Sequence, residues 1–333
     1  MVLRPPHSFT LFSGLRLIAD QNKPRRIKKL IRSVEVSGSR SLRTHGPSSC
    51  HFVQEIRLFF AQIATVRSNP DHQLLLRCND ALIDLLSTSY TGRQAELQRI
   101  RDCLDVVYAD DPSRCALYGM PGVGKTQLAL KYTIVSFREQ YYSYIFWASA
   151  ATPEKLSQGL VKILDLLKLP DRFNPDQSAR LMAARTWLEN GSLESEKRWL
   201  LVLDNANRDT LEDMRRFLPR TNSAGHILFT TRTEDLAEAL ASAAGHKHSC
   251  IELRTPPLPD AVRMLLLSAG FDEDSSDFAK AQEVVNSVGR LPVAVDQAAS
   301  FMKQTHKNLD DLLSLYAGEH KSEVSVCAVL SID

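Results

Sequence analysis

A glycine-rich run that ends in lysine and threonine is the part of this sequence best suited to bind phosphate. Residues 119–126 are Gly-Met-Pro-Gly-Val-Gly-Lys-Thr, which fits the pattern G-x-x-x-x-G-K-T. Glycines let backbone N–H groups close around an oxyanion with no Cβ in the way. Lys125 can reach the β- and γ-phosphates of a nucleotide, and the Thr126 hydroxyl can ligate Mg²⁺.

The flanks of this run decide whether it is a phosphate-binding loop. Residues 115–118 form a short apolar run typical of a buried strand, and residues 127–132 are mostly helix formers. Strand, glycine loop and helix are the arrangement that the chemistry needs, and they argue against a glycine-rich turn that binds nothing. We therefore predict a nucleotide-binding loop made of Gly119, Met120, Pro121, Gly122, Val123, Gly124, Lys125, Thr126 and Gln127.

An aspartate that follows a buried strand is the expected partner of this loop. Residues 199–203 are Trp-Leu-Leu-Val-Leu, and Asp204 comes next. Ligands of open α/β sheets bind at the carboxyl ends of the strands, where Asp204 could hold Mg²⁺ together with Thr126. The alternative is an ordinary aspartate that begins a turn. Beside a matching loop, we predict Thr126 and Asp204 as metal ligands and Asp204 as a catalytic residue.

The residue after this aspartate bears on hydrolysis. Many fast NTPases place a second acid there to orient or deprotonate water. This sequence has Asn205, and an amide cannot act as a base. Asp209 and Glu212 are near in sequence, but nothing else supports a role for them. We expect at most a slow ATPase that acts primarily by binding nucleotide.

A second apolar strand ends in a cation. Residues 227–232 are Ile-Leu-Phe-Thr-Thr-Arg. If this strand lies beside the strand before the loop, Arg232 points at the γ-phosphate, and a guanidinium there reports whether a third phosphate is present. The alternative is a surface arginine in a loop. We include Arg232 among the predicted catalytic residues.

The elements that must position these side chains alternate along the chain. Five strands are expected, at residues 115–118, 144–148, 199–203, 227–231 and 250–253, with helical stretches between them. The clearest helix has Thr152 as its N-cap and Pro153 at its first position. Such alternation predicts an α/β fold, with a parallel five-stranded sheet sandwiched by helices.

Beyond residue 255 the sequence predicts helices alone. One runs from Pro259 to Leu267 and ends at Gly270, a second covers about 277–288, a third follows Pro292, and Asn308 caps a fourth. Together they predict a small all-helical subdomain. A proline in a first helical turn is usually structural, although Pro292 can also present a flat apolar ring to a purine.

Taken in this order, the elements resemble the NB-ARC family of STAND-type P-loop NTPases, over about residues 90–316. Its members are the nucleotide switches of plant resistance proteins, the animal apoptosome scaffold and many fungal NOD-like receptors, and the fungal branch is the most similar. The segments that carry the resemblance are 90–93 (Tyr-Thr-Gly-Arg), 119–130, 146–149 (Phe-Trp-Ala-Ser), 203–205 (Leu-Asp-Asn), 229–232 (Phe-Thr-Thr-Arg) and 289–298.

The resemblance implies both a ligand and a role. Thr91 and Arg93 would lie near the adenine, Pro292 would pack on the base, and Arg232 would sense the γ-phosphate. The ligands would be ADP and ATP with Mg²⁺. The function would be a signalling switch in innate immunity or incompatibility, with self-association or a protein signalling partner, and without nucleic acid or membrane.

One departure from the family concerns the end of the chain. In the family a winged-helix subdomain follows the small helical one, and its histidine locks the ADP state. This sequence ends at Asp333, about where that subdomain should begin. We therefore expect a truncated receptor or an incomplete gene product.

Composition limits the class of protein. The chain has 333 residues, of which 44% are hydrophobic and 24% charged, which is ordinary for a soluble globular protein. No apolar run is long enough to span a bilayer. Six cysteines lie without C-x-x-C pairs, which argues against a zinc site or disulfide scaffold and favours a reducing, cytoplasmic location.

Charged residues are distributed unevenly along the chain. Residues 1–54 carry ten Lys or Arg and two acids, whereas the remainder carries 31 basic and 37 acidic side chains. The basic head is expected to be a disordered tail, with mitochondrial or nuclear targeting as alternatives. The expected organisation is a head at 1–54, a helical linker at 55–87, a P-loop domain at 88–254, a helical lid at 255–318 and a tail at 319–333.

Two other functions stay open at this point. A genuine ATPase with turnover would need a second acid or a substrate site, which the sequence does not offer. A nucleic-acid-binding regulator would use the basic head.

Overall fold

The computed structural model describes residues 77–106, 111–190, 198–242, 250–271 and 277–319. All of these residues belong to one compact unit. The predicted helix at 56–66, the basic head and the tail lie outside the described residues. None of the described helices is both long and apolar enough to cross a membrane.

A parallel sheet is the centre of this unit, with the strand order β1-β3-β4-β5-β2-β6. Its strands are β1 (Cys78–Asn79), β2 (Ser113–Tyr118), β3 (Tyr144–Ser149), β4 (Trp199–Ala206), β5 (Gly225–Thr231) and β6 (Cys250–Glu252). The five predicted strands are all present, which confirms the α/β prediction. The sheet has six strands rather than five, because β1 pairs with β3 through Cys78 and Tyr144.

The segment that contains β1 was expected to be helical. Two residues are too few to show a periodic pattern, so the sequence could not distinguish this strand. The apolar run at 81–86 likewise forms only a 3₁₀ turn, η1 (Ile83–Leu85). Two further 3₁₀ turns are η2 (Pro170–Phe173) and η3 (Arg208–Thr210).

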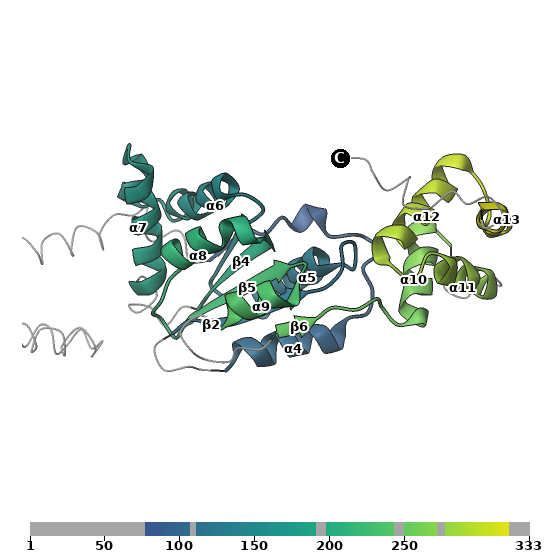
Figure 1. Ribbon diagram of the computed structural model, residues 1–333, viewed down its shortest axis with the longest axis horizontal. Coiled ribbons are helices and arrows are strands. Elements are labelled where there is room, and N and C mark those ends of the chain that lie inside the picture. The colour runs from purple at the N-terminus through teal and green to yellow at the C-terminus, as the bar shows by residue number, and fades with distance from the viewer. Residues whose placement is uncertain (1–76, 107–110, 191–197, 243–249, 272–276, 320–333) are drawn as a thin grey trace, which may run out of the picture. The chain divides into compact units, whose positions relative to one another are not determined.

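Helices cover both faces of the sheet (Figure 1). One face packs against α4 (Gln94–Leu104) and α5 (Lys125–Arg138). The other packs against four helices, α6 (Pro153–Leu166), α7 (Gln177–Asn190), α8 (Leu211–Phe217) and α9 (Glu234–Ala241). Alternate residues of β2 serve the two cores, since Leu117 packs on the first face and Ala116 on the second. Burial on both faces explains why these strands are continuously apolar.

The start of α6 shows how local sequence fixes an element. The Thr152 hydroxyl accepts a hydrogen bond from the Lys155 N–H at 3.3 Å, and Pro153 occupies the first helical turn. Four apolar side chains at helical spacing are then buried against the sheet, namely Leu156, Leu160, Ile163 and Leu164. The cap and the proline match the prediction.

Four helices follow the sheet along the chain, and they share a core of their own. They are α10 (Leu258–Ala269), α11 (Phe278–Ser287), α12 (Pro292–Thr305) and α13 (Leu309–Glu319). Gly270 ends α10 in the left-handed conformation, at φ 84°. Asn308 and Asp311 exchange side-chain-to-backbone hydrogen bonds of 2.9 and 3.1 Å at the start of α13, an Asn/Asp version of the capping box.

Candidate functional site

Three neighbouring strands of the sheet end at the same edge. Strand β2 lies between β5 and β6, and β5 also pairs with β4. The register places Tyr118 of β2 beside Thr231 of β5. The loop after β2, the residues that end β5 and Asp204 of β4 therefore meet, as expected for the ligand-binding edge of an open α/β sheet. The condition that we set for Arg232, a strand next to the loop strand, is fulfilled.

The loop after β2 has the backbone that its glycines permit. At Gly119 φ is 148°, and a Cβ there would lie 2.4 Å from the Leu253 carbonyl oxygen. Helix α5 begins at Lys125, directly after Gly124, whose φ is 99°. The first N–H groups of α5 therefore face the loop, where they and the helix dipole favour an anion. Met120 and Pro121 are exposed on the loop, whereas Val123 is buried beneath it.

The Lys125 ammonium lies within this loop. Its Nζ donates hydrogen bonds to the carbonyl oxygens of Gly119 at 2.7 Å and Met120 at 3.0 Å. Burial, and then the nearby positive charge of Arg232, lower the pKa of Lys125, while Asp204 raises it. Two cations and one carboxylate thus act on one another at the strand ends. Such a site attracts a polyanion, since each added negative charge relieves the repulsion between the cations.

Asp204 is held by two hydroxyl groups. Its Oδ1 accepts hydrogen bonds from Thr126 Oγ1 at 2.9 Å and from Thr230 Oγ1 at 2.6 Å. A carboxylate and a hydroxyl this close are hard oxygen donors of the kind that Mg²⁺ prefers, usually together with phosphate oxygens and water. The two predicted metal ligands are therefore brought together, and their chemistry fits Mg²⁺.

A β-bulge between β4 and β5 lies at Asp204 and Asn205. Leu203 pairs with Phe229 but Ala206 pairs with Thr231, so β4 carries one more residue than β5 at this point. Asn205 takes up the extra length in the left-handed conformation, at φ 59°, and its N–H donates to Thr230 Oγ1 at 2.8 Å. Asparagine tolerates this conformation better than most residues. The amide that cannot act as a base thus also suits the backbone here.

Thr230 is the site residue that sequence reasoning missed. It is buried, and its hydroxyl both accepts from the Asn205 N–H and donates to Asp204. The available signal was a threonine near the end of an apolar strand that neighbours the strand carrying Asp204. Only the register of β4 against β5 shows that its hydroxyl reaches Asp204.

Arg93 connects the loop to the chain segment that leads into α10. It lies in the left-handed conformation before α4, and its guanidinium pairs with Glu96 at 2.8 Å. The same group donates to the carbonyl oxygens of Val123 at 3.3 Å and Arg254 at 2.8 Å. Arg93 is thus placed at the loop, although its predicted contact with adenine, like that of Thr91, stays a prediction.

The start of α12 also packs on the loop. The Val293 N–H donates to the Gly122 carbonyl at 3.2 Å, and Leu291 packs against the core beneath the loop. A Cβ on Gly122, whose φ is 77°, would lie 2.3 Å from Val293 Cγ1. Pro292 is therefore held next to the loop as the first residue of α12. Its packing on a base stays a prediction.

Gln127 has a role that the sequence did not indicate. Its amide oxygen accepts from the Ser87 N–H at 2.8 Å, and its amide nitrogen donates to the Leu85 carbonyl at 2.9 Å. Both ends of the side chain are therefore occupied by the segment around η1. Gln127 connects α5 to that segment, and its predicted nucleotide contact is untested.

The sheet order, the loop after β2 and the acid on β4 define a P-loop nucleotide-binding fold. Within that class, residues 93–255 match the family model described as the NB-ARC domain. This part of the chain belongs to the NB-ARC family. The resemblance that we inferred from the sequence is confirmed.

Among the proteins to which this chain is similar are two relatives and one solved structure. A "nucleotide-binding leucine-rich repeat (NLR)-like protein" of Hyaloscypha variabilis is 26% identical over 267 residues, or 74% of this chain and 26% of the relative. A disease resistance RPP13-like protein of Arabidopsis thaliana is 26% identical over 124 residues, which are 37% of this chain and 14% of that protein. This chain therefore matches about a quarter of the longer fungal relative.

The solved structure is Cdc6p from Pyrobaculum aerophilum. It is 16% identical, covers 75% of this chain and 74% of its own, and superposes with a TM-score of 0.52. A likeness at this level of identity concerns the fold alone.

Removing the Thr230 hydroxyl tests how Asp204 is held. In Thr230→Val the side chain keeps its shape, but Asp204 loses a donor and the Asn205 N–H loses its acceptor. We expect the apparent affinity for Mg²⁺ in the presence of ATP to fall by about 10–100-fold, as is typical when groups that orient metal ligands are removed. A Mg²⁺ titration with a fluorescent ATP analogue measures it.

The matched control is Thr230→Ser, which keeps the hydroxyl and should bind Mg²⁺ as the wild type does. Thermal unfolding of both variants shows that folded protein is compared. An identical Mg²⁺ dependence for the Val and Ser variants would show that Thr230 does not position Asp204.

Proposed function

We propose that this chain is a signalling switch module that binds ADP and ATP with Mg²⁺ and hydrolyses ATP slowly. The observation that carries the proposal is the meeting of Lys125, Arg232 and the pair Thr126–Asp204 at the ends of three adjacent strands. Membership of the NB-ARC family supports the same ligand. The chemistry of the site is that of phosphate and a hard divalent cation.

Each residue has a distinct task in this proposal. Lys125 and the N–H groups at the start of α5 bind the phosphates, and the loop glycines leave room for them. Thr126 and Asp204 would hold Mg²⁺, which when bound neutralises charge on the β- and γ-phosphates. Arg232 follows β5 beside the loop strand, where a γ-phosphate would extend the nucleotide.

Slow hydrolysis is expected because Asn205, not an acid, follows Asp204. Asn205 is exposed at the bulge and carries an amide where a base would be needed. Without a group that takes a proton from water, the bound triphosphate is cleaved slowly, so the bound nucleotide can persist as a signal. The protein is thus primarily a binder, with the exchange of ADP for ATP as its switching event.

The signalling role rests on the relatives. The names of the two relatives, an NLR-like protein and a disease resistance-like protein, motivate a role in innate immunity or incompatibility, with a protein partner or self-association. The matched parts are small fractions of both proteins, so we place only the nucleotide module in this chain. A cytoplasmic location accompanies this role.

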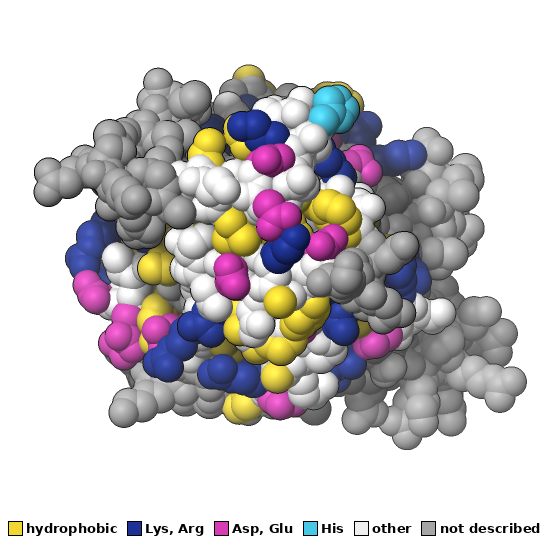
Figure 2. Space-filling view, turned by 90° about the vertical axis from the view of Figure 1, so that its right-hand side faces the viewer, with side chains coloured by type: hydrophobic (Ala, Val, Ile, Leu, Met, Phe, Trp, Pro, Cys, Tyr) yellow, Lys and Arg dark blue, Asp and Glu magenta, His cyan; other side chains and the backbone are white. Residues whose placement is uncertain are grey.

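Nucleic acid is not included among the partners. Figure 2 shows a face on which Lys and Arg side chains of the described residues are interspersed with Asp and Glu. Proteins that follow a phosphate backbone present clustered basic charge instead. This face therefore favours neither DNA nor RNA as a ligand.

Lys125→Ala should abolish the binding of ADP and ATP while leaving the fold intact. The side chain hydrogen-bonds to loop carbonyls and is not part of the core, so its loss removes charge from the site and opens no core cavity. The control is Lys131→Ala on the same helix, where the ammonium lies over the Tyr90 ring, 5.5 Å from its centroid. Fluorescent ADP bound by Lys125→Ala with wild-type affinity would show that the loop is not the nucleotide site.

Arg232→Ala should weaken ATP far more than ADP. A charge-assisted hydrogen bond to a γ-phosphate contributes about 1.5–3 kcal/mol, which corresponds to a loss of about tenfold or more for ATP. ADP lacks that phosphate and should change little. Calorimetry gives both constants, and Arg232→Lys should lie between, because it keeps the charge without the forked geometry. Equal losses for the two nucleotides would exclude a sensor role.

Asn205→Asp should raise ATP turnover above that of the wild type. The substitution supplies a carboxylate beside Asp204, and aspartate also tolerates the left-handed backbone, whereas Asn205→Glu would add about 1–2 kcal/mol of strain. Phosphate release at saturating Mg·ATP measures both rates. We expect a wild-type rate below about 1 per second, the lower limit of typical kinases. A wild-type rate of tens per second would refute the slow switch.

A further inference from the structure

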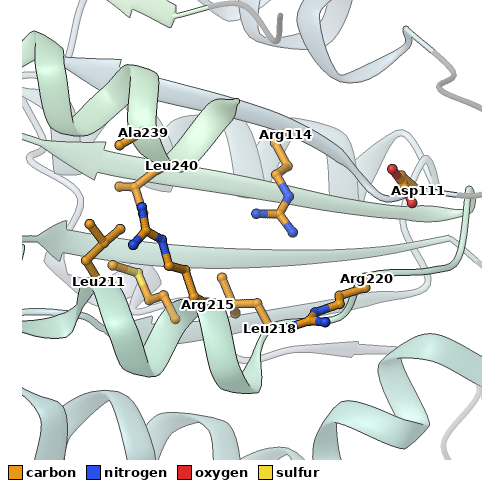
Figure 3. A pocket seen from close by; sticks show the side chains of 9 residues that line it. Asp111, Arg114, Leu211, Arg215, Leu218, Arg220, Ala239 and Leu240 are labelled. Atoms are coloured by element: carbon orange, nitrogen blue, oxygen red, sulfur yellow. The ribbon is translucent and has the colours of Figure 1, made fainter. Parts of the chain in front are cut away.

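A cavity of about 450 Å³ lies between helices α8 and α9 on one face of the sheet. Figure 3 shows Arg114 pointing from β2 into this space, with Arg215 on one side and Arg220 and Asp111 on the other. Side chains of α8 and α9, among them Met214 and Leu240, supply apolar walls. A volume of this size is typical of small-molecule sites.

Arg114 is unusual for a residue in this position. It belongs to a strand whose residues 115–118 pack into the two apolar cores, and its exposed fraction is 9%. Among the described residues, the one hydrogen bond of its guanidinium runs from Nη2 to the Pro219 carbonyl at 3.3 Å, and the side chain forms no ion pair. Buried arginines are rare unless they are paired with an anion.

The charged groups around the cavity also leave Arg114 without a matching anion. The pKa of Arg114 is lowered to about 10, mainly by burial; the charge of Asp111 opposes this shift and that of Arg220 adds to it. Arg215 lines the cavity and is ion-paired with Glu212 at 2.7 Å, and Glu212 itself does not line the cavity. In the part of the chain that the structure describes, the lining holds three guanidinium groups and one carboxylate, an excess of positive charge around a partly open cavity.

We propose that this cavity binds a small organic anion, with a carboxylate or phosphate head and a short apolar body. The head would pair with the guanidinium of Arg114, which presents donors in the forked geometry that matches either anion. The apolar body would lie along the walls formed by Met214 and Leu240. Burial strengthens the pairing, because the head would meet the cation away from water.

This site is separate from the nucleotide site. Arg114 stands near the start of β2, whereas the phosphate loop follows its end at Tyr118. Four residues of strand separate them, or about 13 Å at roughly 3.3 Å per residue. The lining of the cavity contains none of the loop residues. Binding in the cavity therefore does not depend on the nucleotide function proposed above.

The test uses the full chain with excess Mg·ADP, so that the phosphate loop is occupied. Hexyl phosphate, hexanoate and the neutral hexanol are each titrated while the thermal midpoint and the binding heat are recorded. We expect at least one of the two anions to bind and to raise the midpoint, and hexanol to do neither. A preference between the anions identifies the head group. Binding by neither anion, or equal binding by hexanol, would overturn the proposal.

The variant Arg114→Met decides whether binding occurs in this cavity. Replacing a buried charge by an apolar side chain is often neutral or stabilising, so the variant should fold with an unchanged or higher midpoint. It should bind the anion about tenfold more weakly or worse. The control Arg208→Met removes an exposed arginine that is paired with Asp235 and does not line the cavity, and it should bind as the wild type does.

A second variant keeps the test decisive if Arg114→Met does not fold. Arg220→Met removes an exposed cation that lines the cavity, and it should also weaken the anion. Wild-type affinity in every foldable cavity variant would place the anion elsewhere and overturn the proposal.

Discussion

The hydrogen bonds that converge on Asp204 Oδ1 are the interaction on which the rest of the site depends. Thr126 donates from the first turn of α5, and Thr230 donates from β5. One carboxylate oxygen thus fixes the relative positions of the loop helix and two strands. The bulge in β4 interrupts the pairing of Asp204 with β5, although Asp204 stays paired with Ser149 of β3, and Thr230 accepts the Asn205 N–H there. Displacement of any of these three elements would separate the oxygen atoms that are suited to Mg²⁺.

A second set of contacts connects this centre to the helices that follow the sheet. Arg93 donates to carbonyls on the loop and on the segment before α10, and Val293 at the start of α12 donates to Gly122. The loop after β2 therefore follows a strand of the sheet and is also hydrogen-bonded to α12. A nucleotide can shift a conformational equilibrium only through contacts that differ between the states. The Gly122–Val293 hydrogen bond is a contact through which a change in the loop backbone would be transmitted to α12.

Much of this architecture was predictable from the sequence, because the signals are local. The apolar strands, the glycine loop, the Thr152 cap and Asp204 at a strand end each follow from a short run of residues. The features that the sequence did not predict depend instead on contacts between distant segments. Strand β1 is two residues long, so its formation depends on β3 rather than on its own pattern. The left-handed Asn205 exists only because β4 and β5 pair with a bulge between them.

Thr230 and Arg114 illustrate the same limit for function. Each lies in an apolar strand, and the sequence of that strand does not indicate what its polar side chain contacts. The register of the sheet gives Thr230 its contact with Asp204, and the packing of α8 and α9 leaves Arg114 facing a cavity. Contacts between residues this far apart in sequence are set by tertiary pairing, which no local pattern encodes.

Calorimetric titration of the wild-type chain with ATP, in Mg²⁺ and again in excess chelator, tests the central claim most directly. The arrangement of Lys125, Thr126 and Asp204 predicts one ATP per chain, bound more tightly with Mg²⁺ than without it. Binding that is indifferent to Mg²⁺, or no binding of ATP in either buffer, would contradict the account.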